Sequence, residues 1–529
     1  MLAFLRVLWY NDSMKNDDYA VKNTTPEGAV LVREIDELKR ENEELRRQNE
    51  WLLAQLKLSK KRQFGASSEK SEYDFAQLNL FNEAEACSDE SVQEQELTEV
   101  KKHYRKRTRL TTDKLPEDLP VEVVEHKLPE SEQVCPDCGN HLRVMGHESR
   151  EELVLIPASA KIRRHISATY ACRHCETHSD RVPIVKSKFP EPVIKGSFAS
   201  PEAIAHIAAQ KFVMGTPLYR QEQEWNRNGI PLSRQTMSNW LIRATEARLE
   251  PIYDELKRRL LRHEVLHADE TTLQVLNEPG KTAQSKSYMW LYRTSGDAKH
   301  QIVLYEYQPS RKYEHPKAFL KGFTGYLHAD GYDGYHDLPE NITVVGCWAH
   351  LRRKFDEALK IIEPKAREGT ESHRGKQYCD RLFELERQFK DLSSDERHRK
   401  RQELSRPVIE EFFAWITALR TVPKTPIGVA KTYALSQQKY LERYLLDGRL
   451  EISNNRAERS IKPFVIGRKN WLFANTVRGA KASAILYSLI ETAKENGLVP
   501  FEYLTRVFRD APNGAVIEDL LPWGLDTCN

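Results

Sequence analysis

Leu266-His267-Ala268-Asp269 and Leu327-His328-Ala329-Asp330 are two copies of one tetrapeptide, and each copy closes a short apolar run. After the first copy the chain continues as an alternating apolar and polar stretch, which predicts a strand. Two neighbouring strands that each end in Asp would bring two carboxylates to one edge of a sheet. Such a pair is typical of sites for hard divalent cations such as Mg²⁺. The alternative is that each aspartate only caps the backbone amides of a buried turn.

The segment around these two copies alternates strands with short helices. We predict a short helix near residues 316–320, a longer one beginning at Trp348, and strands at 264–276, 288–294, 301–307, 326–330 and 342–347. Three consecutive strands, then helix, strand, segment and strand is the order expected of a ribonuclease-H-like α/β core. We assign this catalytic core to residues 260–350 and 450–480, with residues 351–449 as a helical insertion. The expected fold class is multidomain α+β.

Length and composition indicate a multidomain protein with a mixed charge. The chain has 529 residues, 40% hydrophobic and 30% charged, and a net charge of only +3. Single cores seldom exceed roughly 250–300 residues, so we expect several domains. Nucleic-acid affinity would have to come from local basic clusters. No apolar run approaches the ~20 residues of a membrane span, and no signal peptide is evident, so we expect a cytoplasmic, nucleoid-associated protein without membrane partners.

A heptad repeat dominates the N-terminal region. Leu31, Leu38, Leu45 and Leu52 recur every seven residues, which predicts a coiled coil over 29–58 and a homodimer or higher oligomer. A single amphipathic helix packed on its own protein is the alternative. We expect residues 1–28 to be disordered or an extra N-terminus. Residues 59–125 then form a linker with an acidic run followed by a basic run, the latter being either a solvated arm or a phosphate contact.

Four of the eight cysteines form two Cys-x-x-Cys pairs, a spacing that favours metal binding in a reducing compartment over disulfides. Two such turns supply four thiolates for tetrahedral, structural Zn²⁺. We therefore predict a zinc-binding domain at 126–185, in which a nearby histidine could replace one thiolate. Its ligands would be Cys135, Cys138, Cys172 and Cys175.

Residues 195–250 show a helical period. A helix from Leu218 to Asn228, a short turn, Ser233 as N-cap and a second helix predict a helix-turn-helix. The second helix presents polar side chains that could contact base edges in DNA. A plain helical hairpin fits the same pattern. The proposed DNA contacts are Arg234, Gln235, Ser238 and Asn239.

A third carboxylate follows the insertion. Asn454 or Asn455 can start a helix, and Glu458 lies one turn in, either as an active acid or as a capping-box residue. The stretch 456–481 contains seven Lys and Arg but a single acid, Glu458 itself. Basic side chains in this pattern suit contacts with polynucleotide phosphates, and aromatic side chains suit stacking on nucleobases. The expected DNA contacts here are Arg459, Lys462, Arg468, Lys469 and Trp471, and residues 481–529 are expected to form a C-terminal helical domain.

Taken together, these motifs resemble a known family. His-Ala-Asp-Glu-Thr at Asp269, His-Ala-Asp-Gly-Tyr at Asp330, Cys347–Phe355 and Asn454-Asn455-x-x-Glu458 are similar to the DDE transposases of insertion-sequence family sixty-six. The zipper, the four cysteines and the stretches 470–473 and 492–497 fit it as well. The resemblance implies a DNA transposase that uses double-stranded element ends and target DNA. Small companion proteins of the same element are implied as further partners.

On this basis we expect two-metal phosphoryl transfer with Mg²⁺ or Mn²⁺, in which Asp269 bridges both ions and Asp330 and Glu458 each hold one. We interpret His267 and His328 as supporting or packing residues. Glu270 should point to the opposite face of its strand. Cys347 and His350 could bind a metal, although packing in a helix core is favoured. A nuclease that cuts without joining and a non-catalytic, zinc-containing DNA-binding regulator are the alternatives.

Overall fold

The computed structural model describes residues 160–171 and 184–524, which fall into two compact units. Within the unit that spans residues 66–189, the strands β1 (Thr169–Ala171) and β2 (Ile184–Lys186) form an antiparallel pair. The described residues from Pro190 onwards belong to the other unit, which is a mixed α+β structure.

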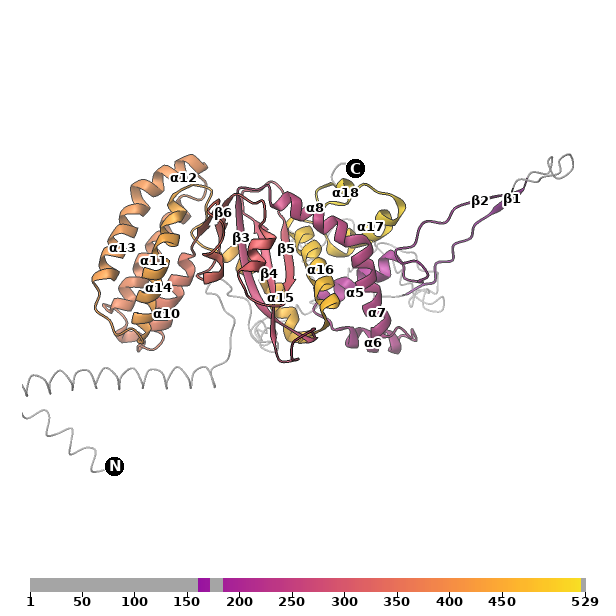
Figure 1. Ribbon diagram of the computed structural model, residues 1–529, viewed down its shortest axis with the longest axis horizontal. Coiled ribbons are helices and arrows are strands. Elements are labelled where there is room, and N and C mark those ends of the chain that lie inside the picture. The colour runs from indigo at the N-terminus through magenta and orange to yellow at the C-terminus, as the bar shows by residue number, and fades with distance from the viewer. Residues whose placement is uncertain (1–159, 172–183, 525–529) are drawn as a thin grey trace, which may run out of the picture. The chain divides into compact units, whose positions relative to one another are not determined.

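A mixed sheet forms the centre of this larger unit (Figure 1). The strand order is β5-β4-β3-β6-β7, with β8 paired to one end of β3. β4 runs antiparallel to both of its neighbours, β5 and β3, whereas β3, β6 and β7 run parallel to one another. The strands are β3 (Val265–Asn277), β4 (Lys286–Thr294), β5 (Val303–Gln308), β6 (Gly325–His328), β7 (Ile342–Val345) and β8 (Ala474–Thr476). The five strands expected from the sequence are therefore confirmed to within a few residues.

Helices cover both faces of the sheet. Successive side chains of a strand point to opposite faces. Accordingly, Tyr292 of β4 stacks on Phe319 of α9 (Glu314–Phe319), with ring centroids 3.8 Å apart. The next residue, Arg293, instead hydrogen-bonds Ser460 of α15 (Asn455–Trp471) from the other face. This packing holds α15, and any side chain at its N-terminus, against β3 and β4.

The outer edge of β5 is covered by α16 (Val477–Glu495). The backbone N–H of Val303 donates to Thr492 Oγ1 at 3.0 Å, and that of Tyr305 donates to Ser488 Oγ at 2.7 Å. Side-chain hydroxyls thereby satisfy an edge that would otherwise be open to pairing with another chain. The domain boundary that we expected at residue 480 falls inside α16.

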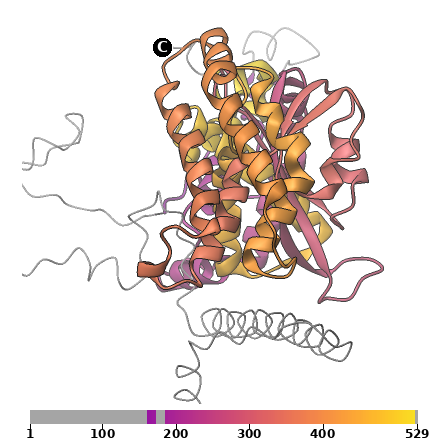
Figure 2. The same cartoon turned by 90° about the vertical axis from the view of Figure 1, so that its left-hand side faces the viewer.

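The residues between β7 and α15 form a helical group with its own core. Trp348, Phe355 and Phe412 are fully buried in it, and Arg401 is buried in an ion pair with Glu386 at 2.6 Å. Figure 2, which faces this group, shows the orange helices side by side. They are α10 (Trp348–Leu359), α11 (Glu371–Gln388), α12 (Ser394–Lys400), α13 (Arg406–Ala418) and α14 (Pro426–Leu441), joined by the short helices η5 (Pro364–Ala366), η6 (Arg401–Ser405) and η7 (Glu442–Leu445).

A second helical layer lies beside the β5 edge of the sheet (Figure 1). Its core contains Met237, Trp240 and Leu241 from one helix and Leu504 and Phe508 from another. It comprises α5 (Pro201–Phe212), α6 (Leu218–Arg227), α7 (Arg234–Ala244), η3 (Thr245–Leu249), α8 (Glu250–Leu260), α17 (Pro500–Asp510), η8 (Ala511–Asn513) and α18 (Ile517–Leu520). In the described part of the chain, no helix combines the length and the apolar character that crossing a membrane requires.

Candidate functional site

The two repeated tetrapeptides meet side by side because β3 and β6 are parallel. His267 is paired in register with His328, so Asp269 and Asp330, each two residues further on, follow the same line of the sheet. Asp330 lies two residues beyond the end of β6, whereas Asp269 lies inside β3. As the predicted strand 264–276 requires, β3 continues past Asp269 to Asn277, and its far half pairs with β4 and β8.

The pKa of the Asp269 carboxyl is shifted by burial and by the acidic residues around it. Burial raises the pKa of this carboxyl well above its usual range, and the charges of Glu270, Asp330 and Glu458 raise it further. Each aspartate also accepts a local backbone bond, Asp269 from Glu270 N–H at 2.8 Å and Asp330 from Tyr332 N–H at 3.0 Å. These bonds occupy one oxygen of each carboxylate and orient it. The charges of Asp330 and Glu458 thus both act on the carboxyl of Asp269.

Asn454 attaches the start of α15 to the sheet. Its Nδ2 donates to the carbonyl of Ala268 at 2.8 Å, and its Oδ1 lies 2.9 Å from His267 Nδ1. Its backbone N–H donates to the sulfur of Cys347 at 3.1 Å. Asn454 is the N-cap residue of α15, but its side chain bonds β3 instead of capping the helix. The position of Glu458, one turn later, therefore depends on the sheet.

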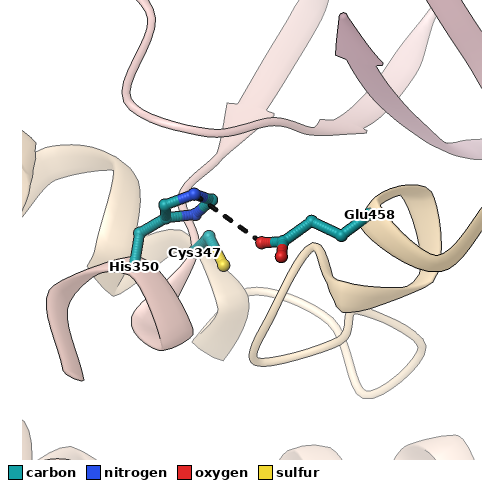
Figure 3. Close-up of side chains that lie close together, drawn as sticks. All are labelled: Cys347, His350 and Glu458. Carbon is teal, nitrogen blue, oxygen red and sulfur yellow. Dashed lines mark ion pairs between the residues drawn. The ribbon is translucent and has the colours of Figure 1, made fainter. Parts of the chain in front are cut away.

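The carboxylate of Glu458 faces the start of α10. Arg353 Nη2 donates to its Oε2 at 3.0 Å, and His350 Nε2 lies 3.6 Å from its Oε1 (Figure 3). Cys347 completes the cluster, since one potential ligand atom from each of the three residues lies within 4.8 Å of the others. Burial lowers the pKa of His350, but the Cys347 sulfur and the Glu458 carboxylate raise it to about 9. Glu458 is thus an ion-paired residue and not a helix cap.

The sequence favours packing in a helix core for Cys347 and His350, with metal binding as the alternative. Cys347 is buried, as core packing requires, and its sulfur also lies within 4.8 Å of potential ligand atoms of His350 and Glu458 (Figure 3). The spacing Cys-x-x-His at a helix start places both side chains on one side of the first turn. Glu458 of α15, which is distant in the sequence, packs against that side of the turn and makes it part of a polar site.

The histidines of the two tetrapeptides support the site from within the sheet. Their rings stack with centroids 4.4 Å apart and an interplanar angle of 13°. Burial lowers the pKa of His267 to about 3, so its ring is neutral near pH 7. His328 Nε2 accepts the backbone N–H of Glu451 at 3.2 Å. Both rings therefore pack and position the strand ends.

Glu270, the strand neighbour of Asp269, is held elsewhere. Its carboxylate accepts a hydrogen bond from Arg311 Nε at 2.8 Å and another from the hydroxyl of Tyr335 at 2.6 Å. Its side chain is 1% exposed. The Glu270 carboxylate is thus engaged by the Arg311 guanidinium and the Tyr335 hydroxyl.

Tyr433 is a residue near the site that the sequence did not indicate. It comes from α14, and a Cβ added at Gly331 would lie 3.0 Å from its hydroxyl oxygen. Burial raises the pKa of Tyr433, and the charges of Cys347 and Asp330 raise it further. No local pattern marks this tyrosine, because it lies within the helical insertion, about 100 positions after Asp330.

The expected helix-turn-helix residues lie on α7. Ser233 caps this helix by accepting the N–H of Thr236 at 3.1 Å, and Gly229, at φ +75°, lies in the turn before it. Arg234 also carries an ion pair to Glu222 of α6 at 3.8 Å. The side opposite the buried core presents Arg234, Gln235 and Asn239 as exposed residues and Ser238 as a half-buried one.

The basic residues of α15 divide into two groups. Arg459 and Lys469 are exposed and Lys462 is half-buried. Arg468 is turned toward β3, where its Nη1 donates to the Thr271 hydroxyl at 3.1 Å. Trp471 packs edge-on against Phe464 with ring centroids 5.4 Å apart. Arg468 and Trp471 therefore have contacts within the protein that the sequence did not reveal.

The remaining expected site residues lie outside the described residues. These are the four cysteines Cys135, Cys138, Cys172 and Cys175, together with the coiled coil at 29–58 and the basic run before residue 110.

Comparisons with known proteins cover most of the chain. Residues 196–482 match the family model described as "Transposase IS66 family", and residues 488–523 match the "IS66 C-terminal element". Residues 132–176, which contain the four paired cysteines, match the "zinc-finger binding domain of transposase IS66". This match indicates a zinc-binding domain. Residues 51–124 match "Transposase C of IS166 homeodomain".

Two relatives come from Sinorhizobium fredii (strain NBRC 101917 / NGR234). The uncharacterized protein y4qI is 32% identical over 422 residues, which cover 76% of this chain and 75% of the relative. The uncharacterized protein y4hP is 31% identical over 411 residues, which cover 74% and 73%. The family matches and these relatives agree with the motifs around the two aspartates and Glu458, and the chain belongs to the IS66 family of transposases.

Proposed function

We propose that this transposase cleaves and joins DNA strands and that Asp269, Asp330 and Glu458 are its catalytic carboxylates. The observation that carries the proposal is the parallel register of β3 and β6, in which Asp269 and Asp330 each lie two residues beyond the paired His267 and His328. Asp330 and Glu458 both raise the pKa of Asp269, although they lie 61 and 189 positions away along the chain. Unrelated turn caps would not gather in this way. A buried carboxyl whose pKa is raised by other carboxylates, as that of Asp269 is, is typical of a functional site.

The sheet supports a ribonuclease-H-like core. Three antiparallel strands are followed by two parallel ones in the order β5-β4-β3-β6-β7, with α9 between β5 and β6. The helical insertion separates β7 from α15, which brings the third carboxylate back to the sheet. This arrangement suits an active site at the line where β3 and β6 meet.

The acidic group fits a divalent cation. Three carboxylates that repel one another would be stabilised by positive charge, and their oxygens are the ligands that Mg²⁺ and Mn²⁺ prefer. In addition, the buried Oε1 of Glu458 has no hydrogen-bond partner among the described residues. Asp269, Asp330 and Glu458 would hold the ions. When bound, such ions lower the pKa of an attacking hydroxyl and stabilise the leaving oxygen in an in-line displacement.

The protein groups around the acids have distinct tasks. Arg353 holds Oε2 of Glu458, while Oε1 faces His350. Asn454 fixes the start of α15 relative to β3. The backbone N–H groups of Glu270 and Tyr332 orient Asp269 and Asp330. Positioning of the carboxylates before substrate arrives reduces the reorganisation that strand cleavage requires.

DNA would bind through basic and polar side chains on two helices. The exposed residues Arg234, Gln235 and Asn239 of α7 suit contacts with the element ends, and Arg459 and Lys469 of α15 suit phosphates near the acids. We further propose that Zn²⁺ binds the four paired cysteines, that the heptad repeat joins two or more chains, and that companion proteins assist the reaction.

The test uses full-length protein and a labelled duplex that carries the ends of its element. Asp330→Asn should abolish Mg²⁺-dependent strand cleavage while DNA binding persists. Asp333→Asn is the matched control, because Asp333 begins the short helix η4 (Asp333–Tyr335) three residues after Asp330 and its side chain is 97% exposed. Cleavage that survives Asp330→Asn would refute the catalytic assignment. Cleaved products without joined products would leave a nuclease, and binding without cleavage in the wild-type protein would leave a DNA-binding regulator.

A further inference from the structure

The cluster beside the acidic site contains ligands of a different chemical type. Cys347 lies directly before α10, His350 lies in its first turn, and Glu458 lies in the first turn of α15. One ligand atom from each lies within 4.8 Å of the other two (Figure 3). In tetrahedral zinc sites the ligands lie about 2.0–2.3 Å from the ion, hence roughly 3.3–3.8 Å from one another. A contraction of about 1 Å would therefore close the cluster around an ion.

Two buried atoms of this cluster lack a hydrogen-bond partner among the described residues. They are Oε1 of Glu458 and Nδ1 of His350. The ion pair between the two side chains, at 3.6 Å, is longer than a hydrogen bond. Buried polar atoms are nearly always paired in folded proteins, so an unpaired set on neighbouring side chains calls for an explanation. A bound cation would satisfy the carboxylate directly.

The surroundings also place a hydrogen-bond donor and a cation beside the proposed ligands. The backbone N–H of Asn454 donates to the Cys347 sulfur at 3.1 Å. Metal ligands bind in their deprotonated forms, so the ion would displace the proton of His350; the thiolate, the Glu458 carboxylate and the Arg353 guanidinium on Oε2 then sum to one negative charge. That charge attracts a divalent cation, while Arg353 keeps the second carboxylate oxygen away from it.

We propose that Cys347, His350 and Glu458 form a binding site for a Zn²⁺-class divalent ion, separate from the site at the four paired cysteines. Thiolate and imidazole select zinc and its chemical relatives over Mg²⁺, which prefers oxygen ligands. Three protein ligands leave a fourth position for water or a phosphate oxygen. The ion would tie the start of α10 to the start of α15, two elements that the helical insertion separates in sequence.

The site shares Glu458 with the acidic group, and the functional consequence rests on the function proposed above. A zinc ion held by Cys347 and His350 withdraws Glu458 from Asp269 and Asp330. Excess Zn²⁺ should therefore inhibit Mg²⁺-dependent cleavage, and added Mg²⁺ should relieve the inhibition. In Cys347→Ser the same Zn²⁺ concentration should inhibit less.

The binding test needs no activity. The full-length protein, with zinc already bound at its four-cysteine domain, is titrated with Co²⁺, which reports thiolate and imidazole ligands by its visible and near-ultraviolet absorption. The wild-type protein should take up one further equivalent with a thiolate band, and Cys347→Ser should lose it. Cys379→Ser is the matched control, because Cys379 is a second buried free cysteine, placed in α11. An unchanged band in Cys347→Ser would overturn the proposal.

Two further variants separate this proposal from the catalytic one. His350→Gln retains the thiolate and should weaken Co²⁺ binding at least tenfold, which keeps the proposal testable if Cys347→Ser does not fold. Binding by His350→Gln as tight as in the wild type would count against the site. Asp330→Asn should keep the cobalt band and lose cleavage, so cleavage that persists in it refutes the catalytic assignment without affecting the metal site.

Discussion

Asn454→Ala should destabilise the protein more than any neighbouring polar substitution. The Asn454 side chain is fully buried and bonds both the Ala268 carbonyl, at 2.8 Å, and His267 Nδ1, at 2.9 Å. Alanine would leave both of these buried groups without a partner. Each unsatisfied buried group costs about 1–3 kcal/mol, so the expected loss in unfolding free energy is about 2–6 kcal/mol. The backbone bond to Cys347 does not depend on the side chain and should persist.

The assay is urea unfolding of the full-length protein, followed by the fluorescence of buried tryptophans such as Trp290 and Trp348. Asn455→Ala is the control, since Asn455 is the next residue, is the first residue of α15 and is only half-buried. It should change the unfolding free energy by no more than about 0.5 kcal/mol, as surface substitutions usually do.

Asn454→Ala also tests whether the contact between β3 and α15 positions the Glu458 carboxylate. If Asn454 positions α15, Asn454→Ala should lower DNA cleavage at urea concentrations where the protein is still folded, and Asn455→Ala should not. Equal unfolding free energies for the two variants, within about 0.5 kcal/mol, would refute the argument that Asn454 joins α15 to β3.

Three further predictions concern other parts of the chain. Burial beside Trp471 lowers the pKa of Lys211 from 10.5 to about 8, so between these values the unfolded chain binds more protons and stability should rise with pH. In Lys211→Met the urea midpoint should rise less between pH 8 and pH 10 than in the wild type, and an equal rise in the two proteins would contradict the prediction. Gly375→Ala should lower the unfolding free energy by about 1–3 kcal/mol, because the new methyl group would collide with the Phe355 ring. This loss should exceed the gain in helix propensity, and a more stable variant would disprove the clash. Cys138→Ser should remove one equivalent of zinc, measured by atomic emission, and unchanged zinc content would exclude Cys138 as a ligand.

Much of the sheet could be predicted from local sequence. Strand and helix positions follow from periodicity, and the expected elements from residue 264 to the helix at Trp348 agree with those observed. The identical offset of Asp269 and Asp330 from paired histidines made their proximity predictable, because parallel strands keep such offsets in register. The start of a helix at Asn454 followed from its local sequence, whereas the hydrogen bonds of the Asn454 side chain to β3 did not.

The sequence by itself determined the elements, the acidic residues and, through its motifs, the family. Only the tertiary structure decided that Cys347 and His350 meet Glu458, that Tyr433 approaches Asp330, and that Arg468 turns inward to β3. The physical reason is the sequence separation over which each interaction acts. Periodicity and capping act within a few residues, whereas these contacts join segments separated by up to about 200 positions. They form only when burial of two separate cores brings α10, α14 and α15 against one line of the sheet.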